Sequence, residues 1–187
     1  MKIKPNASST ELTSPFFKRN EVFCQEFEAF ITKYNGKVKG NYNVWSYLIL
    51  GQISEPKKWN LIYKKSTFTS SGNLWFSSKD QSLLIVAEWT TQRIDTQNSE
   101  FEIRKKRITD LLQLKLNNKT ATLPISEKYI YKSNGTKPAL ITKLENILKG
   151  LFQSEEVYRI TYKNNLLSIE LRSEKHHFNT FESLLEL

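Results

Sequence analysis

The sequence predicts an α+β fold, in which a largely antiparallel, twisted sheet carries its helices mainly on one face. Two patterns carry this prediction. Apolar side chains recur at the helical period between Leu140 and Leu151. Elsewhere, short extended segments follow one another with connections rich in Ser, Gly, Asn and Asp, which is typical of an antiparallel meander. With 187 residues, 39% of them hydrophobic and 25% charged, the chain has the composition of a soluble globular protein with its own core.

The N-terminal residues contain little apolar side chain. Residues 1–15 are rich in Ser, Thr, Asn and Pro, so we expect a flexible tail there. A single α+β domain is expected to occupy residues 16–187.

A first helix is predicted over residues 20–35. Its apolar stripe starts at Phe23 and Phe27, Asn20 is a suitable N-cap, and Gly36 is a natural C-terminal stop. Cys24 lies beside this stripe, and we expect it to be a small buried side chain.

Five extended segments are predicted to form the meander. Two of them are apolar on both faces, Val44 to Leu50 and Leu83 to Ala87, and we expect these to be central strands covered on both sides. The segments are Tyr42 to Gln52, Trp59 to Phe68, Leu74 to Ser78, Leu83 to Gln92 and Glu100 to Arg104.

The C-terminal part predicts a strand, a helix, a hairpin and a last helix. Tyr129 to Lys132 is extended, residues 137–151 have helical spacing, and Tyr158 to Leu171 contains two strands around Lys163-Asn164-Asn165. Phe178, Phe181, Leu184 and Leu185 follow as a short helix. A weak internal strand–helix echo relates residues 99–116, with a helix at 106–116, to residues 126–151.

Bulk composition limits the cellular setting. Only one cysteine is present, so no intramolecular disulfide is possible. No apolar run approaches the roughly 20 residues of a transmembrane segment, and the first residues lack the apolar core of a secretion signal. We therefore expect a cytoplasmic protein without a transmembrane segment; the sequence does not predict an oligomeric state.

The chain is basic, with a formal net charge of +9. Residues 1–65 carry 11 Lys and Arg against 5 acidic residues, and residues 101–149 carry 11 against 4. Such a charge attracts polyanions, but lysine dominates and lacks the fork with which arginine recognises phosphate. A solvated basic surface is the simpler interpretation.

One concentrated basic run stands at the junction of a predicted strand and helix. It comprises Arg104, Lys105, Lys106 and Arg107, and Lys115 and Lys119 follow within or just after the helix. Free N–H groups at a helix N-terminus together with cations make a candidate anion site. The alternative is that all these cations are solvated.

Four tryptophans occur at positions 45, 59, 75 and 89. Alternation along the strands places Trp45, Trp59 and Trp89 on apolar faces, which predicts core packing. Trp75 differs, because its same-face neighbours are Asn73 and Ser77. An aromatic side chain on a polar face is a candidate partner-binding anchor.

Catalytic and cofactor motifs are lacking. There is no phosphate-binding glycine loop, no nucleophile elbow and no zinc-ligand spacing, and His176-His177 is expected in a loop before the last helix. We therefore predict no catalytic residue, no metal site and no cofactor.

The function that these observations favour is a non-enzymatic binding module that recognises another macromolecule, with a protein partner, around Trp75. Two alternatives remain open. One is a weak polyanion binder, for nucleic acid or an anionic membrane surface, acting through the basic run. The other is a small-ligand carrier or enzyme whose site is assembled from scattered residues.

Overall fold

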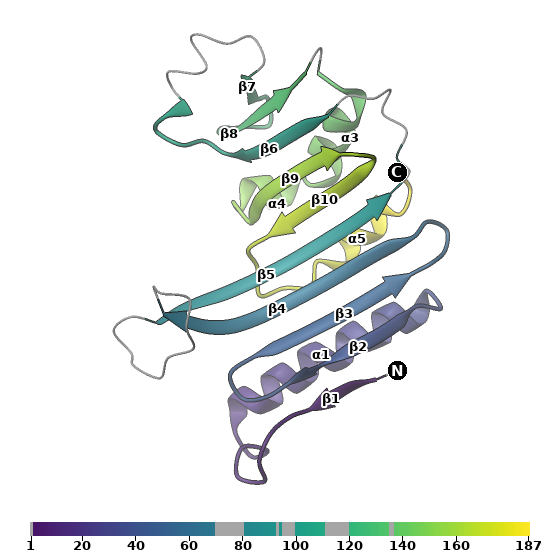
Figure 1. Ribbon diagram of the computed structural model, residues 1–187, viewed down its shortest axis with the longest axis vertical. Coiled ribbons are helices and arrows are strands. Elements are labelled where there is room, and N and C mark those ends of the chain that lie inside the picture. The colour runs from purple at the N-terminus through teal and green to yellow at the C-terminus, as the bar shows by residue number, and fades with distance from the viewer. Residues whose placement is uncertain (1, 70–80, 93, 95–99, 111–119, 135–136) are drawn as a thin grey trace. The chain divides into compact units, whose positions relative to one another are not determined.

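The computed structural model describes residues 2–69, 81–92, 94, 100–110, 120–134 and 137–187. Within these residues the fold is α+β, as predicted, with mostly antiparallel strand pairs and with helices (Figure 1). The chain forms two compact units. The first comprises residues 1–88 and 173–176, and the second comprises residues 89–172 and 177–187. The expectation of one domain over residues 16–187 stays a prediction.

The first unit is built from one long helix and a sheet. Helix α1 spans Pro15–Lys33 and packs against β1, β2 and β3. The strand order is β1-β2-β3-β4-β5, parallel between β1 and β2 and antiparallel from β2 to β4. The strands are β1 (Ile3–Pro5), β2 (Lys37–Tyr42), β3 (Tyr47–Ile53), β4 (Trp59–Thr69) and β5 (Gln81–Gln92), of which β5 continues into the second unit.

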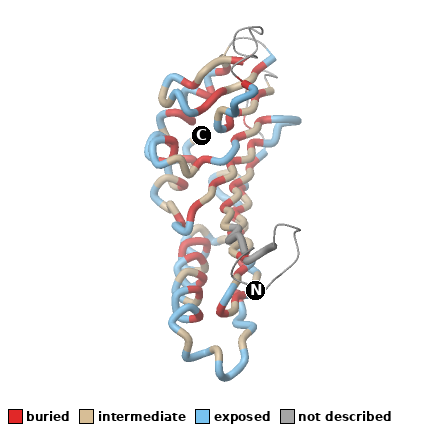
Figure 2. The backbone as a smooth tube through the Cα atoms, turned by 90° about the vertical axis from the view of Figure 1, so that its left-hand side faces the viewer, coloured by how far each residue is buried: buried red, intermediate tan, exposed pale blue. Residues whose placement is uncertain are grey.

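The core of the first unit lies between α1 and one face of its sheet. In β3 the buried residues alternate with more exposed ones, and Figure 2 shows the same change of burial around the turns of α1. Phe27 and Ile31 of the helix are fully buried, as are Ile49, Leu61 and Trp59 of the sheet. Cys24 is also buried, as predicted. The apolar stripe of α1 therefore fixes which face of the sheet is covered.

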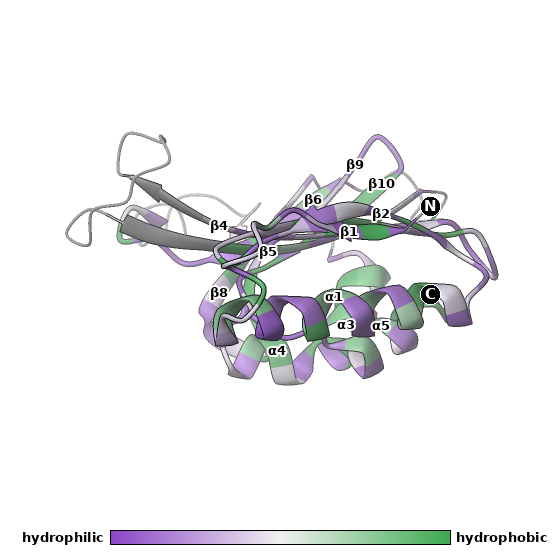
Figure 3. Cartoon of the chain, turned by 90° about the horizontal axis from the view of Figure 1, so that it is seen from below, coloured by the Kyte–Doolittle hydropathy of each residue, from purple (hydrophilic) through white to green (hydrophobic). Residues whose placement is uncertain are grey.

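The second unit has the strand order β5-β10-β9-β6-β8-β7. The strands are β6 (Phe101–Lys105), β7 (Thr120–Leu123), β8 (Ser126–Ser133), β9 (Val157–Lys163) and β10 (Leu166–Leu171). Its helices are α3 (Ala139–Ile147), α4 (Lys149–Gln153) and α5 (Phe178–Leu184). Figure 3 shows all three on one side of β9 and β10, which confirms the predicted one-sided helix layer for this unit.

The predicted hairpin is confirmed, because β9 and β10 pair antiparallel around Asn164 and Asn165. Both asparagines have positive φ, of 50° and 60°, as a two-residue type I′ turn requires. The predicted last helix is α5, and His176 and His177 precede it as expected.

Several N-terminal boundaries differ from the predictions. Residues 3–5 form β1 rather than part of a flexible tail, and they pair with Gly40 to Tyr42. The first helix begins at Pro15 rather than Asn20, because proline is favoured in the first turn of a helix. The extended segment predicted over 42–52 is confirmed for residues 47–52, which lie in β3, but a turn separates them from Tyr42, the last residue of β2. The rest of β2, residues 37–41, was not predicted as a strand.

Burial in the meander also differs from the prediction. Leu48 on β3 is an exposed side chain, so the expectation that residues 44–50 are covered on both faces is wrong. Trp59 and Trp89 are fully buried, as predicted, whereas Trp45 is exposed. The strand β7 was not predicted, and the segments 74–78 and 111–116 lie outside the described residues.

The predicted echo relates two neighbouring strands. Its strand parts are β6 and β8, which pair antiparallel from Phe101 opposite Ser133 to Lys105 opposite Tyr129. The helical part of its first copy falls on residues outside the described ranges, so the echo stays a prediction.

Candidate partner-binding site

A rigid turn joins β2 to β3. The side-chain oxygen of Asn43 accepts hydrogen bonds from the N–H groups of Trp45 (2.9 Å) and Ser46 (2.8 Å) and from the Ser46 hydroxyl (3.1 Å). From α1, the buried amide of Asn20 donates to the carbonyls of Asn43 (2.8 Å) and Val44 (3.1 Å). Five hydrogen bonds thus fix the backbone around Trp45.

This turn presents the indole of Trp45 to solvent. Trp45 is 58% exposed, although Tyr47, the first residue of β3 and two residues later, is buried. Two apolar side chains on α1 are also exposed, Phe16 at 61% and Val22 at 51%. Phe16 stands one helical turn before Asn20, the residue that holds the turn, so α1 and the turn present aromatic side chains at the same end of the first unit. We call Phe16 and Trp45 the Trp45 surface.

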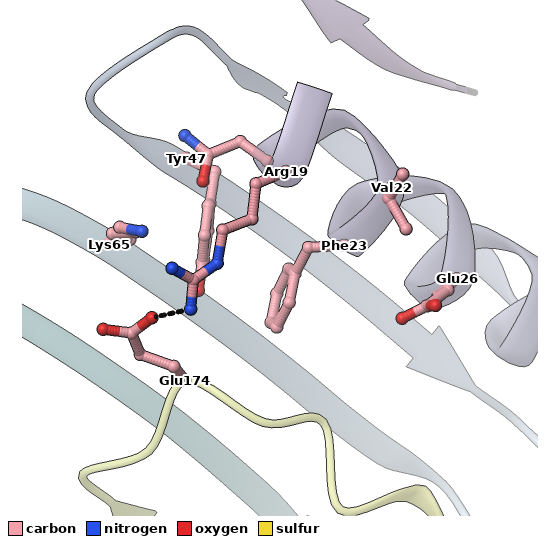
Figure 4. A pocket seen from close by; sticks show the side chains of 8 residues that line it. Arg19, Val22, Phe23, Glu26, Tyr47, Lys65 and Glu174 are labelled. Carbon is pink, nitrogen blue, oxygen red and sulfur yellow. Dashed lines mark hydrogen bonds and ion pairs between the residues drawn. The ribbon is translucent and has the colours of Figure 1, made fainter. Parts of the chain in front are cut away.

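A hollow of about 190 Å³ opens beside this surface. Figure 4 shows Phe23 and Tyr47 facing it, with the guanidinium of Arg19 reaching from α1 to Glu174. The rings of Phe23 and Tyr47 stack with their centroids 4.7 Å apart. The lining residues are Arg19, Asn20, Val22, Phe23, Glu26, Tyr47, Lys65 and Glu174, all in the first unit.

The segment 173–176 brings Glu174 to the hollow. The backbone carbonyl of His176 accepts a hydrogen bond from the Tyr63 hydroxyl at 2.5 Å, and its imidazole stacks on Phe23 with centroids 3.7 Å apart. These two contacts hold the segment against α1 and β4. Glu174, two residues earlier, is thereby placed at the rim of the hollow.

Four side chains that are normally charged line the hollow. Arg19 donates to Glu174 at 2.7 Å, and Glu26 lies 3.5 Å from the Nε2 atom of His176. Lys65 stands directly opposite Tyr47 in the β3–β4 ladder. Burial lowers the pKa of the Lys65 ammonium and the nearby Arg19 lowers it further, whereas Glu174 partly restores it.

Next to Phe23 in the sequence of α1, Cys24 carries a buried thiol. Burial raises the pKa of the Cys24 thiol to about 12, so this cysteine stays protonated and unreactive at neutral pH. Across the described ranges, no group of three or more His, Cys, Asp or Glu side chains is arranged to hold a metal ion.

The residues predicted around Trp75 cannot be placed. Trp75, Asn73 and Ser77 lie outside the described residues, and so do Lys115 and Lys119 of the predicted anion site. Both assignments stay predictions.

The basic run of the predicted anion site, residues 104–107, does lie within the described residues. Arg104 is buried, and its guanidinium donates to both carboxylate oxygens of Asp110, at 2.6 and 2.7 Å. Lys105 forms an ion pair with Glu155 at 3.3 Å, and Arg107 is exposed. Two of the four cations are therefore already paired within the chain, and the run does not form one continuous basic surface.

The sequence did contain a signal for the Trp45 turn. Asn43 and Ser46 are both turn-forming residues, and an Asx turn at Asn43 interrupts the alternation that placed Trp45 in the core. No local pattern in the sequence predicts that Arg19, Lys65 and Glu174 line one hollow. The three residues are far apart in the sequence and come together only in the folded unit.

No protein-family model matches the sequence, and neither the curated proteins nor the solved structures compared with it include a match. In the part of the chain that the structure describes, no helix has both the length and the apolarity to cross a membrane.

Proposed function

We propose that this protein is a non-enzymatic binding module that recognises another protein through the Trp45 surface. The observation that carries the proposal is the exposed Trp45 on a turn fixed by Asn43 and Asn20. Tryptophan is among the residues that contribute most to binding energy at protein interfaces. A rigid backbone also lowers the entropy lost when such a side chain is immobilised.

The neighbouring hollow adds to this support. A partner that covers Trp45 would bury apolar area on α1 as well, while the charged rim around Arg19 and Glu174 gives polar contacts at the edge. Interfaces commonly have such an aromatic centre with a polar rim.

The test is selection of a peptide library on the immobilised protein, followed by affinity measurement with Trp45→Ala. We expect this substitution to weaken binding of the selected peptides at least thirtyfold, because an aromatic hot spot contributes about 2 kcal/mol or more. The free energy of unfolding should change by less than about 0.5 kcal/mol, because the side chain is exposed.

Ile108→Ala is the matched control, because Ile108 is 89% exposed but belongs to the second unit. It should leave peptide affinity unchanged. If Trp45→Ala binds the same peptides as tightly as the wild type, the Trp45 surface is not the binding site and the proposal fails.

The competing proposal is the polyanion binder, and salt separates the two. A protein that contacts 6 to 10 phosphates loses roughly 10³ to 10⁵ in affinity between 50 and 200 mM salt. We expect the Trp45-dependent peptides to bind with less than threefold change over this range, because their contact area is largely apolar. A steep salt dependence that survives Trp45→Ala would favour the polyanion binder.

A further inference from the structure

Lys65 differs from the other charged groups that line the hollow. Arg19 and Glu174 are paired with each other, and Glu26 lies near His176. Within the described residues, no hydrogen bond or ion pair is found for the Lys65 ammonium, and the residue as a whole is only partly exposed.

The surroundings of this ammonium favour an incoming anion. Removing a cation from water without a compensating partner costs free energy, and a counter-charge recovers part of that cost. The lowered pKa of Lys65 agrees with this cost of removing its charge from water, because burial is the largest cause of the shift.

Arg19 can assist in binding such an anion. Its side chain is 67% exposed, and so its ion pair with Glu174 is a surface ion pair, of the kind that contributes little to stability. Exchanging Glu174 for another carboxylate therefore costs little. At this end of the hollow, two cations share a single carboxylate of the chain.

We propose that the hollow accepts an aspartate or glutamate side chain of the partner, with Lys65 as its counter-charge and the Phe23–Tyr47 stack as its apolar wall. This inference rests on the proposed function, since it names the group that the partner inserts beside the Trp45 surface. A volume of about 190 Å³ suits one amino-acid side chain.

A carboxylate fits better than a phosphate. Glu26 and Glu174 both line the hollow, so its four charges sum to zero when all are ionised. A phosphoryl group carries about −1.5 to −2 charges at neutral pH and would be repelled by these carboxylates more strongly than a group of one negative charge.

The experiment is a titration followed by amide chemical shifts in NMR spectra, with N-acetyl-glutamate amide as the probe. The uncharged isostere N-acetyl-glutamine amide is the matched ligand. We expect saturable shifts at Phe23, Tyr47 and Lys65 with the glutamate probe, and at least tenfold weaker binding of the glutamine probe. The pKa of Lys65, followed through its side-chain signals, should rise when the glutamate probe binds.

Two lysine variants sharpen the test. Lys65→Met should reduce affinity for the glutamate probe at least tenfold, whereas Lys64→Met should not, because neighbouring strand residues point to opposite faces. Lys65→Arg keeps the charge and should retain binding, which guards against a general loss of fold. Equal binding of the two probes, undiminished binding by Lys65→Met, or tighter binding of inorganic phosphate would each overturn the proposal.

Failure of this inference can be told from failure of the proposed function. In one outcome, the affinity of selected peptides depends on Trp45, but Lys65→Met changes neither their affinity nor that of the glutamate probe. The protein is then a binding module that acts through the Trp45 surface, and the proposed carboxylate site is wrong. If the glutamate probe binds as expected but no selected peptide depends on Trp45, the hollow is a small-carboxylate site and the proposed partner surface fails.

Discussion

At the scale of single residues, the Asp110 carboxylate of the second unit is buried and accepts several hydrogen bonds. It accepts two hydrogen bonds from Arg104 and a third from the backbone N–H of Arg107 at 2.7 Å. These donors, with the hydrogen bonds of Arg104 as the largest cause, lower the pKa of Asp110 to about 2. The pair is buried and satisfied, so it holds the chain after β6 in place rather than offering charge to a ligand.

This gives a prediction for acid stability. The pKa of Asp110 is lower in the folded state than the roughly 3.9 of an unfolded chain. Its ionised carboxylate therefore adds to the free energy of unfolding in full above pH 5, and this addition is lost as the pH falls to about 2. Between pH 5 and pH 2, we expect the free energy of unfolding to fall by about 2 kcal/mol more in the wild type than in Asp110→Asn, measured by urea unfolding. Asp110→Asn should itself be less stable at pH 7 by about 3 to 5 kcal/mol.

Glu127→Gln serves as the control, because Glu127 is an exposed carboxylate on β8. It should follow the wild-type curve. Parallel pH curves for the wild type and Asp110→Asn would show that the pair does not contribute to acid stability.

At the scale of elements, α1 and α4 end in the same C-terminal capping motif, and a β-hairpin follows each of them. After α1, the N–H of Gly36 bonds to the carbonyl of Ile31 at 2.9 Å, and Asn35 has a φ of 52°. After α4, the N–H of Glu156 bonds to the carbonyl of Leu151 at 3.0 Å, and Glu155 has a φ of 60°. Both are Schellman motifs with a left-handed residue at the same place.

The elements predicted well are those whose signals are all local. Residues 137–151 and the hairpin that follows were predicted within a few residues, because helical periodicity and an Asn-Asn turn lie within one stretch of chain. A change of direction at Leu148 still divides that region into α3 and α4. The β2–β3 turn was missed, because part of what holds it is Asn20, 23 residues earlier.

Gly51 shows how closely α1 approaches the sheet. A Cβ at this position would lie 2.6 Å from the Cδ1 atom of Ile31 and 2.7 Å from the Cζ atom of Phe27. Both side chains are fully buried, so either they or the backbone must shift to admit a methyl group. We expect Gly51→Ala to lower the free energy of unfolding by about 1 to 3 kcal/mol through overpacking, measured by urea unfolding.

The control for this prediction is Gly150→Ala. No atom lies within 4 Å of a Cβ at Gly150, which stands in α4, so alanine should stabilise by up to about 1 kcal/mol. If Gly51→Ala were neutral or stabilising, the close helix–sheet contact would be wrong.

At the scale of the whole molecule, each of the two compact units is built from two separate stretches of the chain. Residues 173–176 belong to the first unit, while the residues on either side of them belong to the second. His176 therefore stacks on Phe23 of α1, whereas Phe181, five residues later, contacts Trp89 with ring centroids 5.4 Å apart. This organisation could not be predicted from local pattern, because it depends on contacts between segments more than 100 residues apart, such as that of Tyr63 with His176.

Two alanine substitutions should separate the units. His176→Ala removes the stack on Phe23 and should accelerate amide hydrogen exchange in α1 and β4. Phe181→Ala empties a fully buried site, costs about 3 to 5 kcal/mol, and should accelerate exchange in α5 and in the strands of the second unit. Hydrogen exchange read by mass spectrometry measures both. The assignment of residues 173–176 to the first unit would be wrong if His176→Ala accelerated only the amides of the second unit.

The order of the segments has a consequence for biosynthesis. A growing chain leaves the ribosome N-terminus first, so α1 and β1 to β4 are available long before Glu174 and His176. Until residue 176 emerges, Tyr63 lacks its hydrogen-bond acceptor and the hollow lacks Glu174 in its place. A nascent chain in which residues 173–176 have not yet emerged would therefore present Trp45 without the completed hollow, and a partner side chain could bind there only after this segment has emerged.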